Sequence, residues 1–280
     1  MTRRFKTYAS FVKIEHSVFS LPLIFAGMLL HVHGWPQRSL VVLIVLAAIS
    51  GRVIAMGLNR IIDAQLDARN PRTKGRELPR GAMHRWEAWV VVVIAGLLYL
   101  TSALAIAPIC FWLSPIPVVL FVGYPYLKRF TVLSHVGLGL AWSMAPLGGW
   151  LAASKSRREI SEIGWLWLFS VLWVAGFDII YATMDEAFDR EAKLHSLPVR
   201  LGQKPALRIA ALLHGLALLA LYVLWRTDLY SPVALRWLMV IGVLFVWQHA
   251  IAERKPEFAF FRLNGVLGFL VLGLVLAGMR

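Results

Sequence analysis

Hydrophobic residues run through this chain in long stretches and do not alternate with polar residues. Segments such as AWVVVVIAGLLYLTSALAIA and NGVLGFLVLGLVLAG are apolar all round, whereas a surface helix of a water-soluble protein keeps a polar face. Apolar runs of about 17 to 25 residues have the length that crosses a bilayer as a helix. The pattern therefore predicts an all-α fold, a polytopic membrane helix bundle.

Nine transmembrane helices are predicted from these runs. They cover residues 16–33, 39–60, 86–106, 108–124, 134–153, 163–183, 205–226, 231–250 and 262–279. No linker or low-complexity tract separates them, so we predict a single integral membrane domain over residues 1–280. Two similar motifs, one in each half, indicate two pseudo-repeat halves, an arrangement that often places binding sites at the repeat interface.

The charged residues agree with a membrane location. The chain is 59% hydrophobic and 16% charged, with a net charge of +14. Such a charge would indicate nucleic-acid binding in a soluble protein, but here the basic residues lie in short loops between apolar runs, so no nucleic-acid partner is expected. Nineteen of the 29 lysines and arginines fall on one side of the nine-span assignment. The positive-inside rule makes that side, with the N-terminus, cytoplasmic, and we expect a bacterial inner-membrane protein.

The aspartates are concentrated in two short stretches. Five of the six lie in GLNRIIDAQLD, residues 57–67, or DIIYATMDEAFD, residues 178–189. Both stretches fall at predicted cytoplasmic ends of spans and lead into basic loops that contain a Leu-Pro pair. Because residues four apart share a helix face, each stretch aligns a set of side chains: Asn59, Asp63 and Asp67 in the first, and Tyr181, Asp185 and Asp189 in the second.

Such carboxylates need a positive partner. Like charges four residues apart destabilise a helix by about 0.2–0.5 kcal/mol, and an ionisable group within a bilayer costs about 2.5 kcal/mol or more unless it is paired. Hard oxygen ligands select Mg²⁺ or Ca²⁺, and Mg²⁺ is usually held by one or two carboxylates together with phosphates. With lysines and arginines nearby, the stretches indicate a metal-bound phosphate or diphosphate. The simpler alternative is interfacial aspartates paired with neighbouring arginines.

The order of the motifs carries a family resemblance. Asn59-x-x-x-Asp63-x-x-x-Asp67 is followed by RELPRG, then by YPYLKR at residues 124–129, and then by the second aspartate stretch with LHSLPVRLG. Over essentially its whole length the chain resembles the UbiA superfamily of intramembrane prenyltransferases. Within that superfamily it looks most like the 4-hydroxybenzoate polyprenyltransferase group, including the branch linked to the futalosine route to menaquinone.

The resemblance implies a fold and a reaction. The expected fold is a nine-helix bundle in which the two aspartate motifs face each other across a cavity open to the cytoplasm and to lipid. The expected reaction is Mg²⁺-dependent transfer of a polyprenyl group from an isoprenoid diphosphate to an aromatic acceptor. The acceptor would be 4-hydroxybenzoate or a related hydroxy-aromatic acid, in ubiquinone or menaquinone biosynthesis. An apolar prenyl tail explains why such an enzyme is embedded in lipid.

The resemblance also assigns roles to individual residues. The expected metal ligands are Asp63, Asp67, Asp185 and Asp189, with Asn59 supporting the first stretch. The expected diphosphate contacts are Arg72, Lys128 and Lys193. The expected acceptor contacts are Arg129, Lys13 and Tyr124, while Asp178 and Tyr181 are the catalytic candidates, orienting the acceptor or helping to take its ring proton.

Two departures from the family pattern leave alternatives open. Position 60 is Arg where the family has Asp, and this cation contacts phosphate or faces solvent, which leaves the number of Mg²⁺ ions open. Residues 13–17 read KIEHS where relatives carry an Arg-Asp-Lys-Pro type of sequence, which leaves the acceptor open. The alternatives are another UbiA-type acceptor or a cation-coupled secondary transporter, because intramembrane acids on repeats also bind transported ions.

Overall fold

The structure is a computed structural model and describes residues 2–13, 20–32, 34 and 36–279. All regular structure in these ranges is helical, which confirms the predicted all-α class. Eight helical segments are long and apolar enough to cross a membrane: Arg38–Ile62, Arg85–Ile106, Pro108–Leu127, Ser134–Ser154, Ile160–Glu191, Gln203–Thr227, Pro232–Ala252 and Pro256–Gly278.

Each of these eight segments overlaps one predicted span. The first predicted span, 16–33, corresponds to a shorter apolar helix, α2 (Leu21–His31). Residues 16–19 and 33 of that span lie outside the described part of the chain, so the count of nine helices is approximate.

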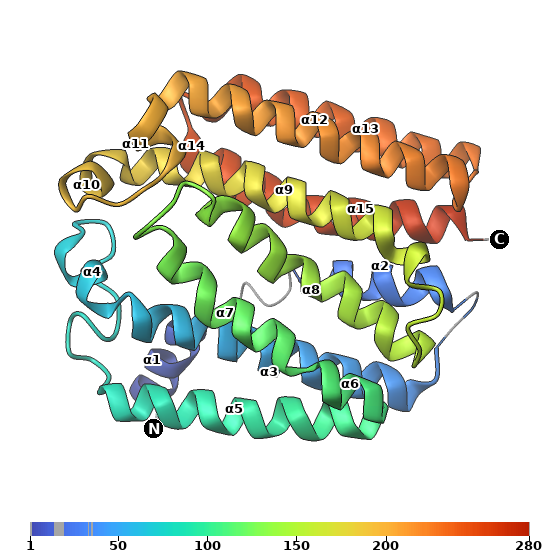
Figure 1. The fold of residues 1–280 in the computed structure, drawn as a ribbon, viewed down its shortest axis with the longest axis horizontal. Coiled ribbons are helices and arrows are strands. Elements are labelled where there is room, and N and C mark those ends of the chain that lie inside the picture. The colour runs from blue at the N-terminus through green and yellow to red at the C-terminus, as the bar shows by residue number, and fades with distance from the viewer. Residues whose placement is uncertain (1, 14–19, 33, 35, 280) are drawn as a thin grey trace. The chain divides into compact units, whose positions relative to one another are not determined.

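The chain divides into two compact units. The first comprises residues 1–18 and 37–126, and the second comprises residues 19–36 and 127–280. The helices of the first unit are α1 (Thr2–Val12), α3 (Arg38–Ile62), α4 (Ala64–Arg69), α5 (Arg85–Ile106), α6 (Pro108–Leu113) and α7 (Pro115–Leu127). Within it, α3 packs along α5 (Figure 1), and Phe11, Leu58 and Val92 join α1, α3 and α5 in one buried apolar cluster.

Two hydrogen bonds, in addition to this apolar cluster, attach helix α1 to the rest of the first unit. Ser10 Oγ donates to Glu77 Oε1 at 2.6 Å, and the Tyr8 hydroxyl donates to Glu87 Oε1 at 2.8 Å. The second bond stabilises the protonated phenol, so it raises the pKa of Tyr8 above its ordinary value. Glu87 also accepts from the backbone N–H of His84 at 2.7 Å and so caps α5. Helix α1 is therefore held both to the loop that follows α4 and to the first turn of α5.

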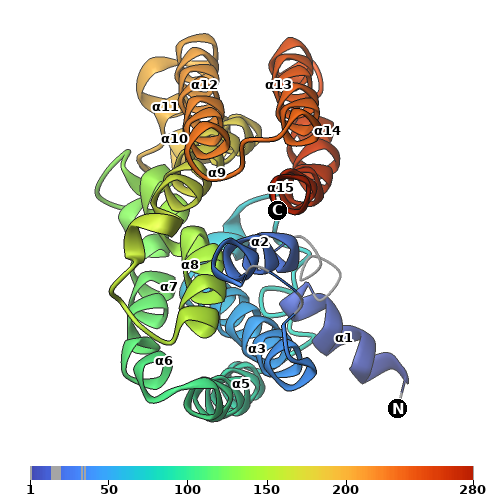
Figure 2. The same cartoon turned by 90° about the vertical axis from the view of Figure 1, so that its right-hand side faces the viewer.

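Six helices of the second unit form a closed ring. In order of contact they are α2, α8 (Ser134–Ser154), α9 (Gly164–Ala182), α12 (Gln203–Thr227), α13 (Pro232–Ala252) and α15 (Asn264–Gly278). Each packs against the next, and α15 packs against α2 (Figure 2). Short segments complete the unit: η2 (Ile160–Ile163), η3 (Thr183–Asp185), α10 (Glu186–Glu191), α11 (Leu197–Leu201), α14 (Pro256–Phe258) and a π-helical turn η4 (Ala259–Leu263).

The α2–α8 contact depends on two glycines, which gives a stability prediction. A Cβ added at Gly149 would overlap the backbone of Ile24, and one at Gly27 would overlap the backbone of Pro146. Close backbone approach at small residues is a common way for membrane helices to associate. Gly149→Ala should therefore lower the free energy of unfolding by about 1–3 kcal/mol, the usual cost of overpacking.

The control for this prediction is the neighbouring glycine. A Cβ at Gly148 would meet open space, so Gly148→Ala should leave stability unchanged or slightly increased, since alanine favours helix over glycine. Unfolding of both variants by sodium dodecyl sulfate in mixed micelles provides the comparison. Equal stability of the two variants would contradict the close α2–α8 packing.

Candidate active site

The first aspartate stretch spans a break between two helices. Helix α3 ends at Ile62, α4 begins at Ala64, and Asp63 lies between them with φ −92° and ψ 4°. The backbone N–H of Asp63 donates to Asn59 at 2.9 Å, and that of Asp67 donates to Asp63 at 2.8 Å. The four-residue spacing therefore continues through the break. Both aspartates are buried, with 3% and 7% of their surface exposed, and Asn59 Nδ2 donates to Asp63 Oδ2 at 3.4 Å.

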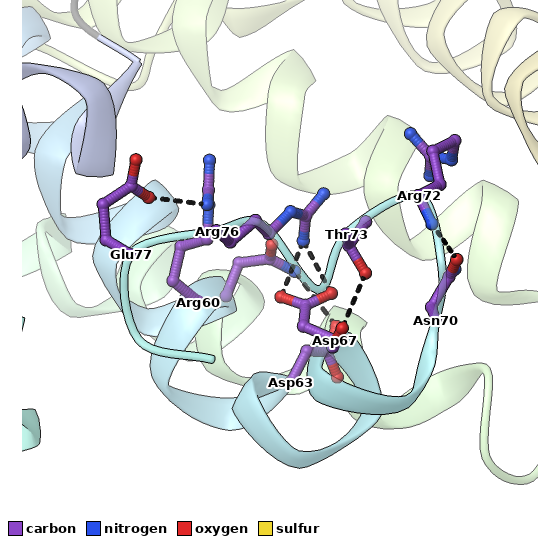
Figure 3. Close-up of polar contacts among 9 residues, drawn as sticks. Arg60, Asp63, Asp67, Asn70, Arg72, Thr73, Arg76 and Glu77 are labelled. Atoms are coloured by element: carbon purple, nitrogen blue, oxygen red, sulfur yellow. Dashed lines mark hydrogen bonds and ion pairs between the residues drawn. The ribbon is translucent and has the colours of Figure 1, made fainter. Parts of the chain in front are cut away.

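Arg76 neutralises the second of these aspartates. Its Nη1 lies 2.8 and 2.7 Å from the two carboxylate oxygens of Asp67 (Figure 3). Thr73 Oγ1 donates to the backbone carbonyl of Asp67 at 3.2 Å, so the loop after α4 folds back over the carboxylate. Asp67 is thus paired with a neighbouring arginine, as expected if the aspartates are interfacial charges and not metal ligands. Arg76 was not among the site residues predicted from the sequence.

Arg60 is buried and paired. Only 4% of its surface is exposed, and its Nη1 donates to Glu77 Oε2 at 3.1 Å (Figure 3). The side chains of the pair are 5% and 6% exposed, and the other oxygen of Glu77 accepts from Ser10. The expectation that Arg60 faces solvent is therefore wrong. Because a buried cation is costly unless it is paired, the Glu at position 77 accounts for how an arginine is tolerated at position 60.

The second aspartate stretch has a similar break. Helix α9 ends at Ala182, a 3₁₀ turn follows, and α10 begins at Glu186. Asp185 precedes α10 with φ −109° and ψ 3°, close to the angles of Asp63. This region of backbone space is sparsely populated and is common among active-site residues. Asp63 and Asp185, each the middle residue of a set spaced four apart, therefore both lie immediately before a short helix with similar backbone angles.

Basic and acidic groups gather around the second stretch. Asp189 interacts electrostatically with Asp185, Lys128 and Asp178. The backbone carbonyl of Lys128 accepts from the N–H of His195 at 2.7 Å, which attaches the segment after α7 to the loop after α10. Within the second unit, three predicted acidic residues and one predicted diphosphate contact thus lie near one another.

The remaining predicted site residues have diverse surroundings. Tyr181 packs on Phe260 with ring centroids 4.5 Å apart. Lys193 is exposed and adopts φ +54°, a left-handed conformation in which the chain turns after α10. Lys13 adopts a similar φ of +50° after α1.

The side chain of Arg72 is exposed, while its backbone N–H donates to Asn70 Oδ1 at 2.9 Å. Tyr124 and Arg129 are partly buried.

His135 is a site residue that the sequence did not reveal. It is buried at the start of α8, and its Nδ1 lies 2.7 Å from Asp178 Oδ2 on α9. Asp178, a predicted catalytic residue, therefore has an imidazole partner 43 residues away in the chain. No spacing or periodicity in the sequence could have indicated this pair.

A second polar cluster, within the second unit, joins α2 to η2 and the residue before it. Within the described ranges, the only three candidate metal-binding side chains that come together are His31, Glu159 and Glu162. His31 Nδ1 lies 3.0 Å from Glu162 Oε2, which also accepts from Trp150 Nε1 at 3.0 Å. His33, two residues further along the chain, lies outside the described residues. Glu159 is exposed and His31 is partly exposed.

The donor set of the aspartate stretches fits a hard divalent cation. Each stretch supplies carboxylate oxygens one helical turn apart, and Mg²⁺ needs only one or two protein carboxylates because water and phosphate complete its coordination. In the first stretch both oxygens of Asp67 already contact a cation, the Arg76 guanidinium. Metal binding at Asp67 therefore requires Arg76 to share or release this carboxylate, whereas Asp63 is supported by Asn59.

The fold and site together define an integral membrane protein whose helix ends carry two acidic stretches beside basic loops. The profile of the UbiA prenyltransferase family matches residues 20–274. The chain therefore belongs to this family and is a membrane-embedded prenyltransferase.

Similar proteins from bacteria carry a more specific name. The 4-hydroxybenzoate octaprenyltransferase of Alcanivorax borkumensis is 31% identical over 236 residues, which cover 82% of this chain and 80% of the relative. That of Vibrio atlanticus is 28% identical over 274 residues, 95% of each chain.

Solved structures share the fold. The apo structure of a UbiA homologue from Aeropyrum pernix K1 matches with a TM-score of 0.88 and 30% identity, covering 95% of this chain and 99% of that chain. A UbiA homologue from Archaeoglobus fulgidus, solved with GPP and Mg²⁺, matches with a TM-score of 0.73 and 18% identity over 98% and 99% of the two chains.

Proposed function

We propose that this protein transfers a polyprenyl group from an isoprenoid diphosphate to 4-hydroxybenzoate or a related hydroxy-aromatic acid, with Mg²⁺ as cofactor. The observation that carries the proposal is the repeated helix break, which puts Asp63 and Asp185 in the same backbone conformation within two acidic stretches. The names of the bacterial relatives support the acceptor class, and the GPP and Mg²⁺ bound by the Archaeoglobus fulgidus homologue support the donor and metal.

The acidic and basic residues serve the diphosphate end of the donor. Asp63 and Asp67, and Asp185 and Asp189, are the proposed metal-binding carboxylates, with Asn59 holding Asp63 through its amide. Bound Mg²⁺ supplies positive charge to the departing diphosphate. Lys128, Arg72 and Lys193 are the proposed protein cations for the same group, and Lys128 interacts electrostatically with Asp189 in the structure.

The second half of the reaction is assigned to residues that meet the acceptor. The bond between the allylic carbon and the diphosphate oxygen breaks, and both electrons leave with the diphosphate. A carbon of the electron-rich ring then bonds to the allylic carbon, and its proton is lost to a base. Asp178 is the proposed base or orienting group. Arg129 suits the acceptor carboxylate because a guanidinium can bind it through two parallel hydrogen bonds, and Tyr124, Tyr181 and Lys13 complete the proposed set.

An acceptor panel tests this function. Purified protein in detergent is supplied with a polyprenyl diphosphate, Mg²⁺ and one of three acceptors: 4-hydroxybenzoate, a dihydroxynaphthoate or a glycerol-phosphate lipid. Mass analysis of the lipid product should find prenylated 4-hydroxybenzoate. An adduct only with another acceptor would keep the prenyl transfer and overturn the proposed acceptor. Absence of any adduct or diphosphate release would favour the transporter alternative.

Membrane orientation gives a further prediction. We propose that the protein lies in a bacterial inner membrane with its N-terminus and both aspartate stretches on the cytoplasmic side, because the basic loops concentrate there. With nine spans, a reporter fused after Arg280 should lie on the non-cytoplasmic side. A matched fusion after Lys255, in the basic loop between α13 and α14, should be cytoplasmic. Cytoplasmic reporters in both fusions would mean that the number of spans is even.

A further inference from the structure

The buried imidazole of His135 has two distinct partners, one on each ring nitrogen. Nδ1 lies 2.7 Å from Asp178 Oδ2, and Nε2 lies 3.3 Å from the backbone nitrogen of Leu197, the first residue of α11. A backbone N–H can only donate, so Nε2 is the acceptor in this contact. A neutral imidazole then carries its proton on Nδ1 and donates it to Asp178. The partners thus assign the tautomer of His135.

The two side chains of this pair differ in their exposure. The side chain of His135 is 4% exposed, whereas that of Asp178 is 22% exposed, so the imidazole lies behind the carboxylate and the carboxylate keeps accessible surface. Trp142 and Phe177 pack edge to face nearby on the same two helices, α8 and α9. A hydrogen bond from a buried donor restricts the orientation of a carboxylate. In metal sites, similar hydrogen bonds from neighbouring residues orient the side chains that bind the metal.

We infer that His135 is a positioning residue for the acceptor half of the reaction. Its Nδ1–H fixes one oxygen of Asp178, so that the accessible part of the carboxylate meets the hydroxyl or ring proton of the aromatic acceptor. This inference rests on the proposed function and extends it, because it names a second residue, on another helix, that governs acceptor use. The contact of Nε2 with Leu197 is a separate structural tie between α8 and α11.

Two substitutions separate these two contacts. In His135→Asn the amide nitrogen can take the place of Nδ1 and donate to Asp178, but nothing reaches the position of Nε2. In His135→Gln the amide oxygen can take the place of Nε2 and accept from Leu197, but no donor remains at the position of Nδ1. Each variant therefore keeps one contact and loses the other, and both remain polar at a buried position.

The test is steady-state kinetics of the full-length protein, with each substrate varied at a saturating level of the other. His135→Gln should lower kcat/KM for 4-hydroxybenzoate by about tenfold or more, in the range seen when an orienting hydrogen bond is lost. The KM for the polyprenyl diphosphate should not change. His135→Asn should stay within about threefold of the wild type by the same reasoning, and the melting temperatures of both variants are measured in parallel.

The outcomes distinguish this inference from the proposed function. A greater loss in His135→Asn than in His135→Gln, equal losses in both, or a raised KM for the diphosphate would each overturn the positioning role, because the contact with Leu197 or general folding would then dominate. A wild-type protein that prenylates none of the aromatic acceptors would contradict the proposed function itself, and with it this inference.

Discussion

Replacing Asp63 or Asp185 with asparagine is expected to lower kcat/KM for prenyl transfer by more than about 100-fold, because even residues that only orient metal ligands are commonly worth 10–100-fold. Asparagine keeps the size and most hydrogen bonds of the side chain but removes the negative charge that a divalent cation needs. Asp63 and Asp185 lie at similar helix breaks, one in each aspartate stretch. The measurement is product formation by purified variants over a range of Mg²⁺ concentrations.

The matched control for these variants is Asp228→Asn. Asp228 is the one aspartate of the sequence outside the two stretches, and it is exposed at the end of α12. Its loss should leave activity at the wild-type level. Membrane insertion and melting temperature should be similar in all three variants. Wild-type activity in Asp63→Asn or Asp185→Asn would remove that residue from the proposed metal site.

Replacing Glu77 with leucine is expected to lower the free energy of unfolding by about 3–5 kcal/mol, the usual cost of leaving one member of a buried ion pair uncompensated. Glu77 and Arg60 are 6% and 5% exposed and 3.1 Å apart, and Glu77 also accepts from Ser10 on α1. The double variant Arg60→Met, Glu77→Leu should recover most of the loss, since well-packed apolar residues can replace a buried pair. Unfolding by sodium dodecyl sulfate in mixed micelles measures all three proteins.

An exposed ion pair is the control for this experiment. Arg190 and Glu186 are 2.8 Å apart and four residues apart on α10, with side chains 60% and 25% exposed. Glu186→Gln should change stability by less than about 1 kcal/mol, as is typical of exposed pairs. If the double variant is no more stable than Glu77→Leu alone, the stabilisation by Glu77 does not come from its pairing with Arg60.

The sequence predicted the helices well because a bilayer imposes a simple rule on composition and length. The spans expected at 39–60 and 86–106 correspond to helices at Arg38–Ile62 and Arg85–Ile106. The sequence did not predict the interruptions at Asp63 and Asp185. A helix interrupted at one residue can keep its four-residue spacing, as the bond from the Asp67 N–H to the Asp63 carbonyl shows, so the break leaves the residue pattern unchanged.

The partners of the site residues could not be predicted for a different reason. Arg76 meets Asp67, Glu77 meets Arg60 and His135 meets Asp178 across separations of 9, 17 and 43 residues. These contacts depend on how loops return and on which helices pack together, and no periodicity encodes them. The charged residues themselves were visible, but the sequence alone left Arg60 with two roles, phosphate contact or solvent exposure. The buried carboxylate of Glu77 excludes solvent exposure.

The central claim is that this chain cleaves an isoprenoid diphosphate with the help of a divalent cation held by its aspartates. The most direct measurement is release of diphosphate from a polyprenyl diphosphate by the purified wild-type protein, with 4-hydroxybenzoate present, before and after removal of Mg²⁺ by a chelator. Release should stop on chelation, return when Mg²⁺ is restored and fall by more than about 100-fold in Asp63→Asn. Release that is unaffected by chelation, or no release with any polyprenyl tail length or acceptor, would contradict the central claim.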